Sequence, residues 1–297
     1  MGAKDITEKT LEAYNDVFAD IVNVLLFKGK RIIMEDDLEE DAPRSHYKAE
    51  GIIHEMERDV AKFWKKQNVR IAFYGIENQT DPDRYMPQRV IGYDGTAYRA
   101  QLLDVDKNGK PKGVYPVATL VLYFGIKHWK YPLTLSDSID IPEELRPFVN
   151  DYKVNLFEIA YLTDEQVEMF KSDFRYVADY FIQRRKNKSY IPAPGEVKHI
   201  HETLELLKVL TGDIRFEDAC RLLKGDEKTM REAILDRLEE EYMEKGIEKG
   251  IEQGERQAMS LIKILIDNNR FEDLKKVTED EAYRKKLCQE FFSSNDI

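Results

Sequence analysis

Cysteine is nearly absent from this chain, which contains two in 297 residues, Cys220 and Cys288. Both fall in stretches with helical periodicity, and two such residues cannot build the disulfide framework of a small secreted protein. No paired C-x-x-C motif is present, which argues against a structural zinc site. A reducing compartment is therefore favoured, and we expect a cytoplasmic protein.

Long apolar runs are also absent. The longest, VATLVLYFGI at 117–126, is too short to span a bilayer and is typical of a central strand. The amino-terminal stretch MGAKDITEKTLEAYND lacks the apolar core of a signal peptide. These two absences predict a protein without a membrane segment.

Positive charge is in deficit, because 46 Lys and Arg residues stand against 57 Asp and Glu residues, for a net charge of −11. Phosphate binding depends on Lys and Arg, so a general nucleic-acid coat protein is excluded. A nuclease is not excluded, since cations bound in an acidic site make that site attractive to phosphate.

Common catalytic motifs are missing as well. The chain contains no Walker loop and no G-x-S-x-G element. His199 and His201 are two positions apart in an expected helix, where such residues do not share a face. A zinc site is therefore not expected there.

The residues that are present suffice for a folded core, since 42% of them are hydrophobic and 11% aromatic. The periodic segments follow the order helix, three strands, helix, strand and then mainly helices, which predicts an α/β fold with a mixed sheet. We expect a first helix at 9–27, strands at 45–51, 55–64, 69–79 and 117–124, and further helices from 87 and at 142–150, 154–162, 164–185, 196–211 and 215–224.

The carboxyl-terminal region is expected to form a long charged helix at 228–266. Its segment GIEKGIEQGERQ places Gly246, Gly250 and Gly254 on one face. Each glycine costs about 1 kcal/mol in a helix interior, so an exposed weak helix is the simple explanation. We favour a close helix–helix contact between subunits, which predicts a homo-oligomer.

A carboxylate stands where a buried strand should not have one. The apolar run IAFYGI is followed at once by ENQ, and a buried carboxylate is costly unless it is paired or binds a metal. Side chains alternate along a strand, so Glu77 and Gln79 point the same way. The polar segment KKQN at 65–68 has hairpin length, and pairing through it would bring Glu57 or Asp59 to Glu77. Two converging carboxylates favour Mg²⁺ or Mn²⁺.

A further oxygen ligand is available from the first expected helix. Asp16 and Asp20 are one turn apart there and are therefore neighbours. Either carboxylate could complete a metal site, and the pattern does not choose between them.

These stretches together resemble a known family. ERDVAKFW, RIAFYGIENQTDPDRYMPQRVIGYDG, the preceding YNDVFADIVNVLLF and the glycine repeat resemble the PD-(D/E)XK nuclease family transposases, specifically the recombination-promoting nuclease and YhgA-like group. An MP-x-R-x-x-x-Y segment is part of the resemblance, here Met86, Pro87, Arg89 and Tyr93. The resemblance spans most of the chain and is densest between residues 10 and 130.

The resemblance implies a restriction-endonuclease-like mixed sheet flanked by helices, followed by a mainly helical carboxyl-terminal region. A nuclease-like domain would occupy residues 1–215, with its core at about 10–130 and a helical extension at 131–215. A charged helical tail would occupy residues 216–297.

The resemblance also assigns site residues. Asp59 and Glu77 match the family's two motif acids, and they would hold the metal together with the main-chain carbonyl of Asn78. Gln79 stands where the superfamily name has Lys; an amide can orient a water but carries no charge to stabilise an oxyanion. The acid of the superfamily's first helix would correspond to Asp16 or Asp20.

The implied function is a cytoplasmic, Mg²⁺- or Mn²⁺-dependent DNA endonuclease that hydrolyses phosphodiester bonds and promotes recombination. Two alternatives remain open. One is a catalytically silent nuclease fold that serves as a binding or assembly module, which the acidic net charge and Gln79 would suit. The other is a metal-dependent nuclease whose substrate is RNA.

Basic residues near the expected hairpin are candidates for contact with a nucleic-acid backbone. Arg89 is the stronger candidate because it is close in sequence to the motif acids. The other candidates could equally well be solvent-exposed side chains of the hairpin with no functional role. They are Lys62, Lys65, Lys66 and Arg70.

Overall fold

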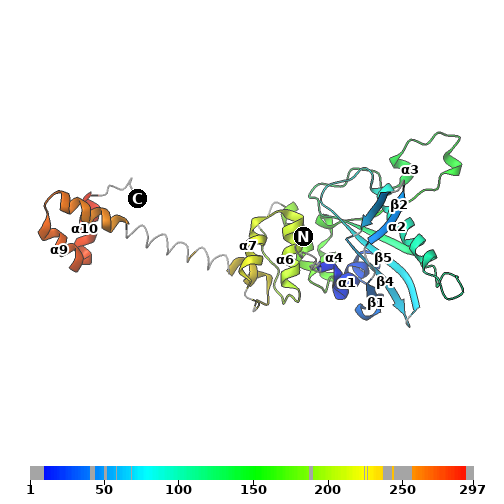
Figure 1. The fold of residues 1–297 in the computed structure, drawn as a ribbon, viewed down its shortest axis with the longest axis horizontal. Coiled ribbons are helices and arrows are strands. Elements are labelled where there is room, and N and C mark those ends of the chain that lie inside the picture. Colours follow the sequence, from blue (N-terminus) through cyan, green and yellow to red (C-terminus); the bar gives the residue numbers. More distant parts are fainter. Residues whose placement is uncertain are drawn as a thin grey trace. The chain divides into compact units, whose positions relative to one another are not determined.

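The computed structural model describes residues 10–40, 44–49, 52–57, 59–67, 69–186, 190–223, 225, 227–236, 243 and 256–291. The chain divides into two units, Met1–Ile234 and Leu235–Ile297. The first unit contains the strands, and the second contains helices α9 and α10 (Figure 1).

A mixed sheet of five strands forms the centre of the first unit, which confirms the α/β prediction. Its order is β1-β4-β5-β6-β7. The pairs β1–β4 and β4–β5 are antiparallel, whereas β5–β6 and β6–β7 are parallel. The strands are β1 (Leu38–Glu40), β4 (Val60–Lys66), β5 (Val69–Gln79), β6 (Val117–Tyr123) and β7 (Asn155–Glu158).

The hairpin between β4 and β5 has the turn that the sequence predicted. Gln67 lies in that turn with a φ of 52°. The register pairs Phe63 with Phe73 and Val60 with Ile76. Asp59, which directly precedes β4, is thereby placed beside the carboxyl end of β5.

Helices cover both faces of the sheet. Helix α2 (Met86–Leu103) packs its Ala97 with Phe63 and Phe73. Helix α1 (Asn15–Leu25) lies on the other face, where its Phe18 and Asn15 contact Lys62. Successive residues of a strand face opposite sides, so β4 is covered on both.

The expected first helix at 9–27 is divided in two. A short 3₁₀ helix, η1 (Leu11–Ala13), precedes α1, and Tyr14 between them has an extended backbone. The break changes the direction in which the residues before Tyr14 point. The break therefore separates Glu12 from Asp16 and Asp20, which lie on α1.

Several expected elements differ from the structure. The stretch 154–162 is β7 and the 3₁₀ helix η4 (Ile159–Tyr161), because pairing with β6 determines its conformation. The stretch 142–150 holds only the 3₁₀ helix η3 (Arg146–Phe148), in which a proline removes a helical donor. The expected strand 55–64 is divided between β4 and β3 (Ile52–Glu57), and β3 pairs with β2 (Arg44–Ala49) in a separate sheet.

The rest of the first unit is helical, as predicted. Rings of Phe124, Phe174 and Phe181 pack together and join this region to the end of β6. The expected helix 164–185 is interrupted between α4 and α5. The helices are α3 (Leu135–Ser138), α4 (Asp164–Met169), α5 (Phe174–Arg185), α6 (Ile200–Thr211) and α7 (Ile214–Leu222). The π-helical turn η5 (Glu232–Asp236) spans the boundary between the two units.

The second unit contains a small helical core. Residues 256–267 are helical and are followed by α9 (Phe271–Glu279) and α10 (Glu281–Phe291). Leu261, Leu265, Val277 and Leu287 are buried together. The glycine repeat at 246–254 lies outside the described residues, so the homo-oligomer stays a prediction. In the part of the chain that the structure describes, no helix is long and apolar enough to cross a membrane.

Candidate active site

Asp59 and the end of β5 are joined by a direct hydrogen bond. The main-chain N–H of Asn78 donates to Oδ2 of Asp59 at 2.6 Å. The structure therefore brings together the two chain segments that the sequence analysis selected. Asp59 is exposed as a whole residue, but the surrounding protein shields its carboxyl from water and so raises the pKa of that group. The hydrogen bond from Asn78 and the charge of Arg89 act in the opposite direction.

Glu77 is buried, with 4% of its surface exposed, and is held by three donors. Arg89 from the first turns of α2 donates to its Oε1 in a close ion pair. Gln79 Nε2 donates to the same oxygen at 3.1 Å, and the Tyr93 hydroxyl lies 3.4 Å away. Burial and the negative charge of Asp59 raise the pKa of Glu77 to about 7 against these favourable partners.

Arg89 is thus placed at the site, but its charge is engaged by carboxylates. Its second guanidinium nitrogen donates to Asp83 at 3.0 Å. Burial works against its charge, but hydrogen bonds to Tyr93 and Asp83 and the charge of Glu77 raise the pKa of Arg89. It holds Glu77 in place rather than presenting a free cation.

A third carboxylate, Glu12 of η1, lies at the site and was not singled out from the sequence. It is completely buried, and its Oε1 accepts a hydrogen bond from Asn78 Nδ2 at 3.1 Å. Burial raises the pKa of Glu12 to about 7, and the charge of Asp59 contributes in the same direction. Its Oε2 is buried without a hydrogen-bond partner.

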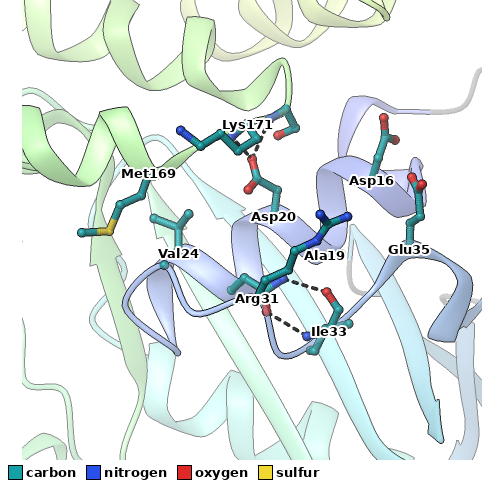
Figure 2. Close-up of a pocket in the computed structure, with 12 residues that line it drawn as sticks. Asp16, Ala19, Asp20, Val24, Arg31, Ile33, Glu35, Met169 and Lys171 are labelled. Atoms are coloured by element: carbon teal, nitrogen blue, oxygen red, sulfur yellow. Dashed lines mark hydrogen bonds between the residues drawn. The ribbon is translucent and has the colours of Figure 1, made fainter.

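Asp16 and Asp20, the acids expected from the first helix, lie elsewhere. Asp16 accepts from Lys198 Nζ at 2.7 Å and from His199 Nε2 at 3.2 Å. Asp20 accepts the main-chain N–H of Lys171 at 2.7 Å, and Figure 2 shows it turned toward that segment. Both acids line a separate cavity of about 410 Å³.

Glu12 could have been found from spacing, since Glu12, Asp16 and Asp20 follow one another every four residues. In one continuous helix they would share a stripe. The break at Tyr14 separates Glu12 from the other two. A sequence pattern that predicts a single helix cannot show that separation.

One feature is common to Glu12, Asp59 and Glu77. Each is anchored through one carboxylate oxygen, while no described residue donates a hydrogen bond to the other oxygen. Asp59 lies within electrostatic reach of both of the others, because its charge raises both their pKa values. Asp59 therefore lies near both Glu12, which contacts the side chain of Asn78, and Glu77, which contacts Arg89.

A cavity of about 690 Å³ opens beside Glu12 and Asp59, and Glu77 is not among the residues that line it. Gln79 and Asp59 line it on the side of the sheet, and α6 forms much of the opposite wall. The lining residues are Thr10, Leu11, Glu12, Tyr14, Asp59, Asn78, Gln79, Thr80, His201, Glu202, Glu205, Leu206, Val209 and Leu210. None of the described residues lines both cavities.

The chemistry of these donors suits a hard cation, since carboxylate and amide oxygens are what Mg²⁺ and Mn²⁺ prefer. Glu12 Oε2 and Asn78 Oδ1 are both buried oxygens without a donor, which is the kind of atom a cation satisfies. The carboxylates of Glu12, Asp59 and Glu77, however, do not converge on one point. Among the described residues, no three of His, Cys, Asp and Glu are placed to hold one metal ion between them.

The basic residues predicted from the hairpin do not lie at this site. Lys62 is 1% exposed and donates to Asn15 at 2.6 Å, so it cannot reach a phosphate. Lys65 and Arg70 are both paired with Glu39 of β1, at 3.2 and 2.5 Å. Lys66 is exposed at the same end of the hairpin.

Comparison with known families gives one match. Residues 65–189 match the family model described as "Putative transposase, YhgA-like". This confirms the resemblance to that group over the matched residues. No curated protein and no solved structure matches the chain.

Proposed function

We propose that this chain, whose residues 65–189 carry the YhgA-like transposase match, is a divalent-metal-dependent DNA endonuclease with a restriction-endonuclease-like core. The family description supports a DNA-processing function, and the proposal specifies the reaction as phosphodiester hydrolysis that promotes recombination. The supporting observation is that Asp59 lies near both Glu12 and Glu77 at the end of β5, with each carboxylate anchored through one oxygen.

Asp59, Glu77 and Glu12 would hold the metal, with the main-chain carbonyl of Asn78 as a further ligand. A bound Mg²⁺ or Mn²⁺ supplies charge stabilisation at the phosphoryl oxygens and lowers the pKa of a coordinated water. Glu12 takes the role first expected of Asp16 or Asp20. The carboxylates would have to draw closer together to share a cation, because no three acids among the described residues are placed to hold one ion.

Gln79 lines the cavity and is positioned by its 3.1 Å hydrogen bond to Glu77. Its amide oxygen accepts a hydrogen bond from water, so Gln79 orients the water that attacks the phosphorus atom. With a pKa of about 7, Glu12 is about half ionised at neutral pH, and cation binding would favour its ionised form. Arg89 keeps Glu77 oriented toward the site.

A silent binding module is the second candidate, and one contact favours it. The ion pair with Arg89 already neutralises Glu77, so the buried carboxylate does not require a metal for its charge. In such a protein the acids would be structural. Metal binding separates the two candidates.

Plasmid cleavage in Mg²⁺ or Mn²⁺ tests the proposal, with Asp59→Ala, Glu77→Ala and Glu12→Gln as variants. We expect the wild type to nick or linearise the plasmid, and each variant and a chelator to abolish cleavage. Asp16→Asn and Asp20→Asn are matched controls that should still cleave. Cleavage that survives Asp59→Ala and Glu77→Ala contradicts the site. A folded wild type that neither cleaves nor binds a cation supports the silent module.

A further inference from the structure

The hairpin residues predicted to contact phosphate lie at the opposite end of β5 from the acids. This strand has eleven residues and begins beside Lys66, whereas the acids stand at its carboxyl end. At roughly 3.3 Å per residue, Arg70 and Gln79 are about 30 Å apart. A backbone that reaches the acids must be held by other cations.

Three loops meet at the end of the sheet where the acids stand. The first follows β5 (residues 80–85), the second follows β6 (residues 125–131), and the third is η4 after β7. The N–H of Phe124 donates to the Gln79 carbonyl at 2.8 Å, so the second loop starts directly at the site. The Tyr161 hydroxyl of η4 donates to the main-chain carbonyl of Ile126 at 3.0 Å, so η4 lies beside the second loop.

The loop after β6 is fixed firmly by its neighbours. Trp129 packs edge-on against Tyr123 at 5.2 Å, and its N–H donates to Glu158 at 2.7 Å. The His128 ring stacks on Tyr161 at 3.7 Å. A side chain at Gly125 would collide with the ring of Tyr123, so a larger residue there would force that ring to move.

This fixed loop presents cations that are not neutralised. Lys127 and Lys130 flank its anchored part and are exposed, and Arg84 is exposed on the loop after β5. Among the described residues, none accepts a hydrogen bond or an ion pair from these three side chains. Each of Arg84 and Lys130 stands beside the ring of the next tyrosine, at 6.0 and 5.1 Å.

Negative charge at the same place is largely engaged. Asp83 is paired with Arg89 at 3.0 Å, and Glu158 accepts from His128 at 3.2 Å. Asp81 is the remaining carboxylate of these loops. Cations without an acidic partner can bind the phosphates of a nucleic-acid backbone. At this position they would hold the neighbouring phosphates while one phosphate enters the site beside the acids at the end of β5.

We propose that Arg84, Lys127 and Lys130 form the backbone-binding rim of this protein and hold the phosphates of nucleic acid on either side of the acids at the end of β5. The substrate, DNA, rests on the proposed function. The position of the rim rests on the loops themselves. The rim replaces the hairpin residues as the binding surface.

The salt dependence of binding tests the rim. A labelled DNA duplex is titrated with the full-length protein in Ca²⁺ at several salt concentrations, and a gel verifies that the duplex stays intact. The slope of log K against log salt reports how many phosphates are neutralised, and each lost contact lowers it by about one. We expect Lys127→Ala/Lys130→Ala to lower the slope by about two and Arg84→Ala by about one.

The matched control is Lys65→Ala/Lys66→Ala, which removes the same charge at the other end of β5. Its slope should equal that of the wild type. Equal losses from the two double variants, an unchanged slope for Lys127→Ala/Lys130→Ala, or no binding by the wild type would each overturn the rim. An RNA duplex of the same sequence is titrated in parallel, and tighter binding there would make RNA the substrate.

Cleavage is measured separately on the same preparations. If Lys127→Ala/Lys130→Ala lowers the slope relative to the control but the protein does not cleave, the rim is supported and the nuclease activity is rejected. If the protein cleaves but the slopes do not differ, the nuclease activity is supported and the rim is rejected.

Discussion

Glu12 and Asn78 face each other with one hydrogen bond formed and two oxygens left over. Asn78 Nδ2 donates to Glu12 Oε1 at 3.1 Å, while Glu12 Oε2 and Asn78 Oδ1 are buried without partners. A buried acceptor that lacks a donor costs about 1–3 kcal/mol. The two unpaired oxygens therefore lower the stability of the fold, and they are the atoms that a bound cation would satisfy.

Glu12→Gln should stabilise the metal-free protein at pH 8. The pKa of Glu12 is raised from 4.5 to about 7, which corresponds to roughly 3 kcal/mol against its charged form. A neutral amide avoids this penalty and can offer a donor to Asn78. Thermal unfolding in chelator should show a higher midpoint for the variant than for the wild type.

The same variant should lose the stabilisation that Mg²⁺ or Mn²⁺ gives to the wild type. Asp16→Asn is the control, because Asp16 is engaged by Lys198 and His199. A Glu12→Gln protein that is less stable than the wild type in chelator, yet equally stabilised by Mn²⁺, would remove Glu12 from the site.

Stability without metal should fall as the pH rises from about 4.5 to 7. The folded protein keeps protons on Glu12 and Glu77 up to about pH 7, while the unfolded chain releases them near pH 4.5. Between these values the folded state binds more protons, so the free energy of unfolding decreases with pH. Chemical denaturation across this range measures the slope, which should be smaller in Glu12→Gln.

A divalent cation should oppose that trend, because it binds the ionised carboxylates. Stabilisation by Mn²⁺ is expected to be larger at pH 8 than at pH 6. The same stabilisation at both pH values would speak against ligation by these two acids.

Arg89→Ala should destabilise the protein by roughly 1–3 kcal/mol, the cost of leaving a buried carboxylate without its charged donor. Without the cation the pKa of Glu77 rises further, so the loss should be greater at pH 8 than at pH 6. Arg99→Ala, at an exposed position of the same helix, serves as the control and should change stability by less than about 0.5 kcal/mol. Equal losses at pH 6 and pH 8 would contradict the pairing with Glu77.

Lys62→Met should leave the salt dependence of DNA binding unchanged. Lys62 is 1% exposed and its charge is directed to Asn15 beneath α1. Lys127→Met removes the same charge with the same replacement side chain, and it should lower the slope by about one. Fluorescence anisotropy at several salt concentrations distinguishes the two positions.

Much of the sheet could be predicted because local rules determine it. The turn at 65–68, the apolar alternation of β5 and its polar end needed no distant information, and they placed Asp59 beside Asn78 correctly. By contrast, the stretch of β7 is a strand because β6 lies beside it. Nothing in its own residues distinguishes it from a helix.

The site was less predictable because distant partners decide which polar residues are available. Lys62 alternates with Ala61 and Phe63, and only the covering α1 shows that both faces of β4 are buried. Lys65 and Arg70 share an ion pair with Glu39, a residue in a strand too short to predict. Partners of this kind are fixed by the tertiary fold.

Tyr14, where the first helix is interrupted, also reaches across to α6. Its hydroxyl donates to Glu202 at 2.7 Å, and its ring lies 3.8 Å from that of His199. The helical extension therefore acts as a brace for the turn that carries Glu12. The family segment 65–189 contains neither that turn nor the brace, so a fragment of those residues alone would hold an incomplete set of acids.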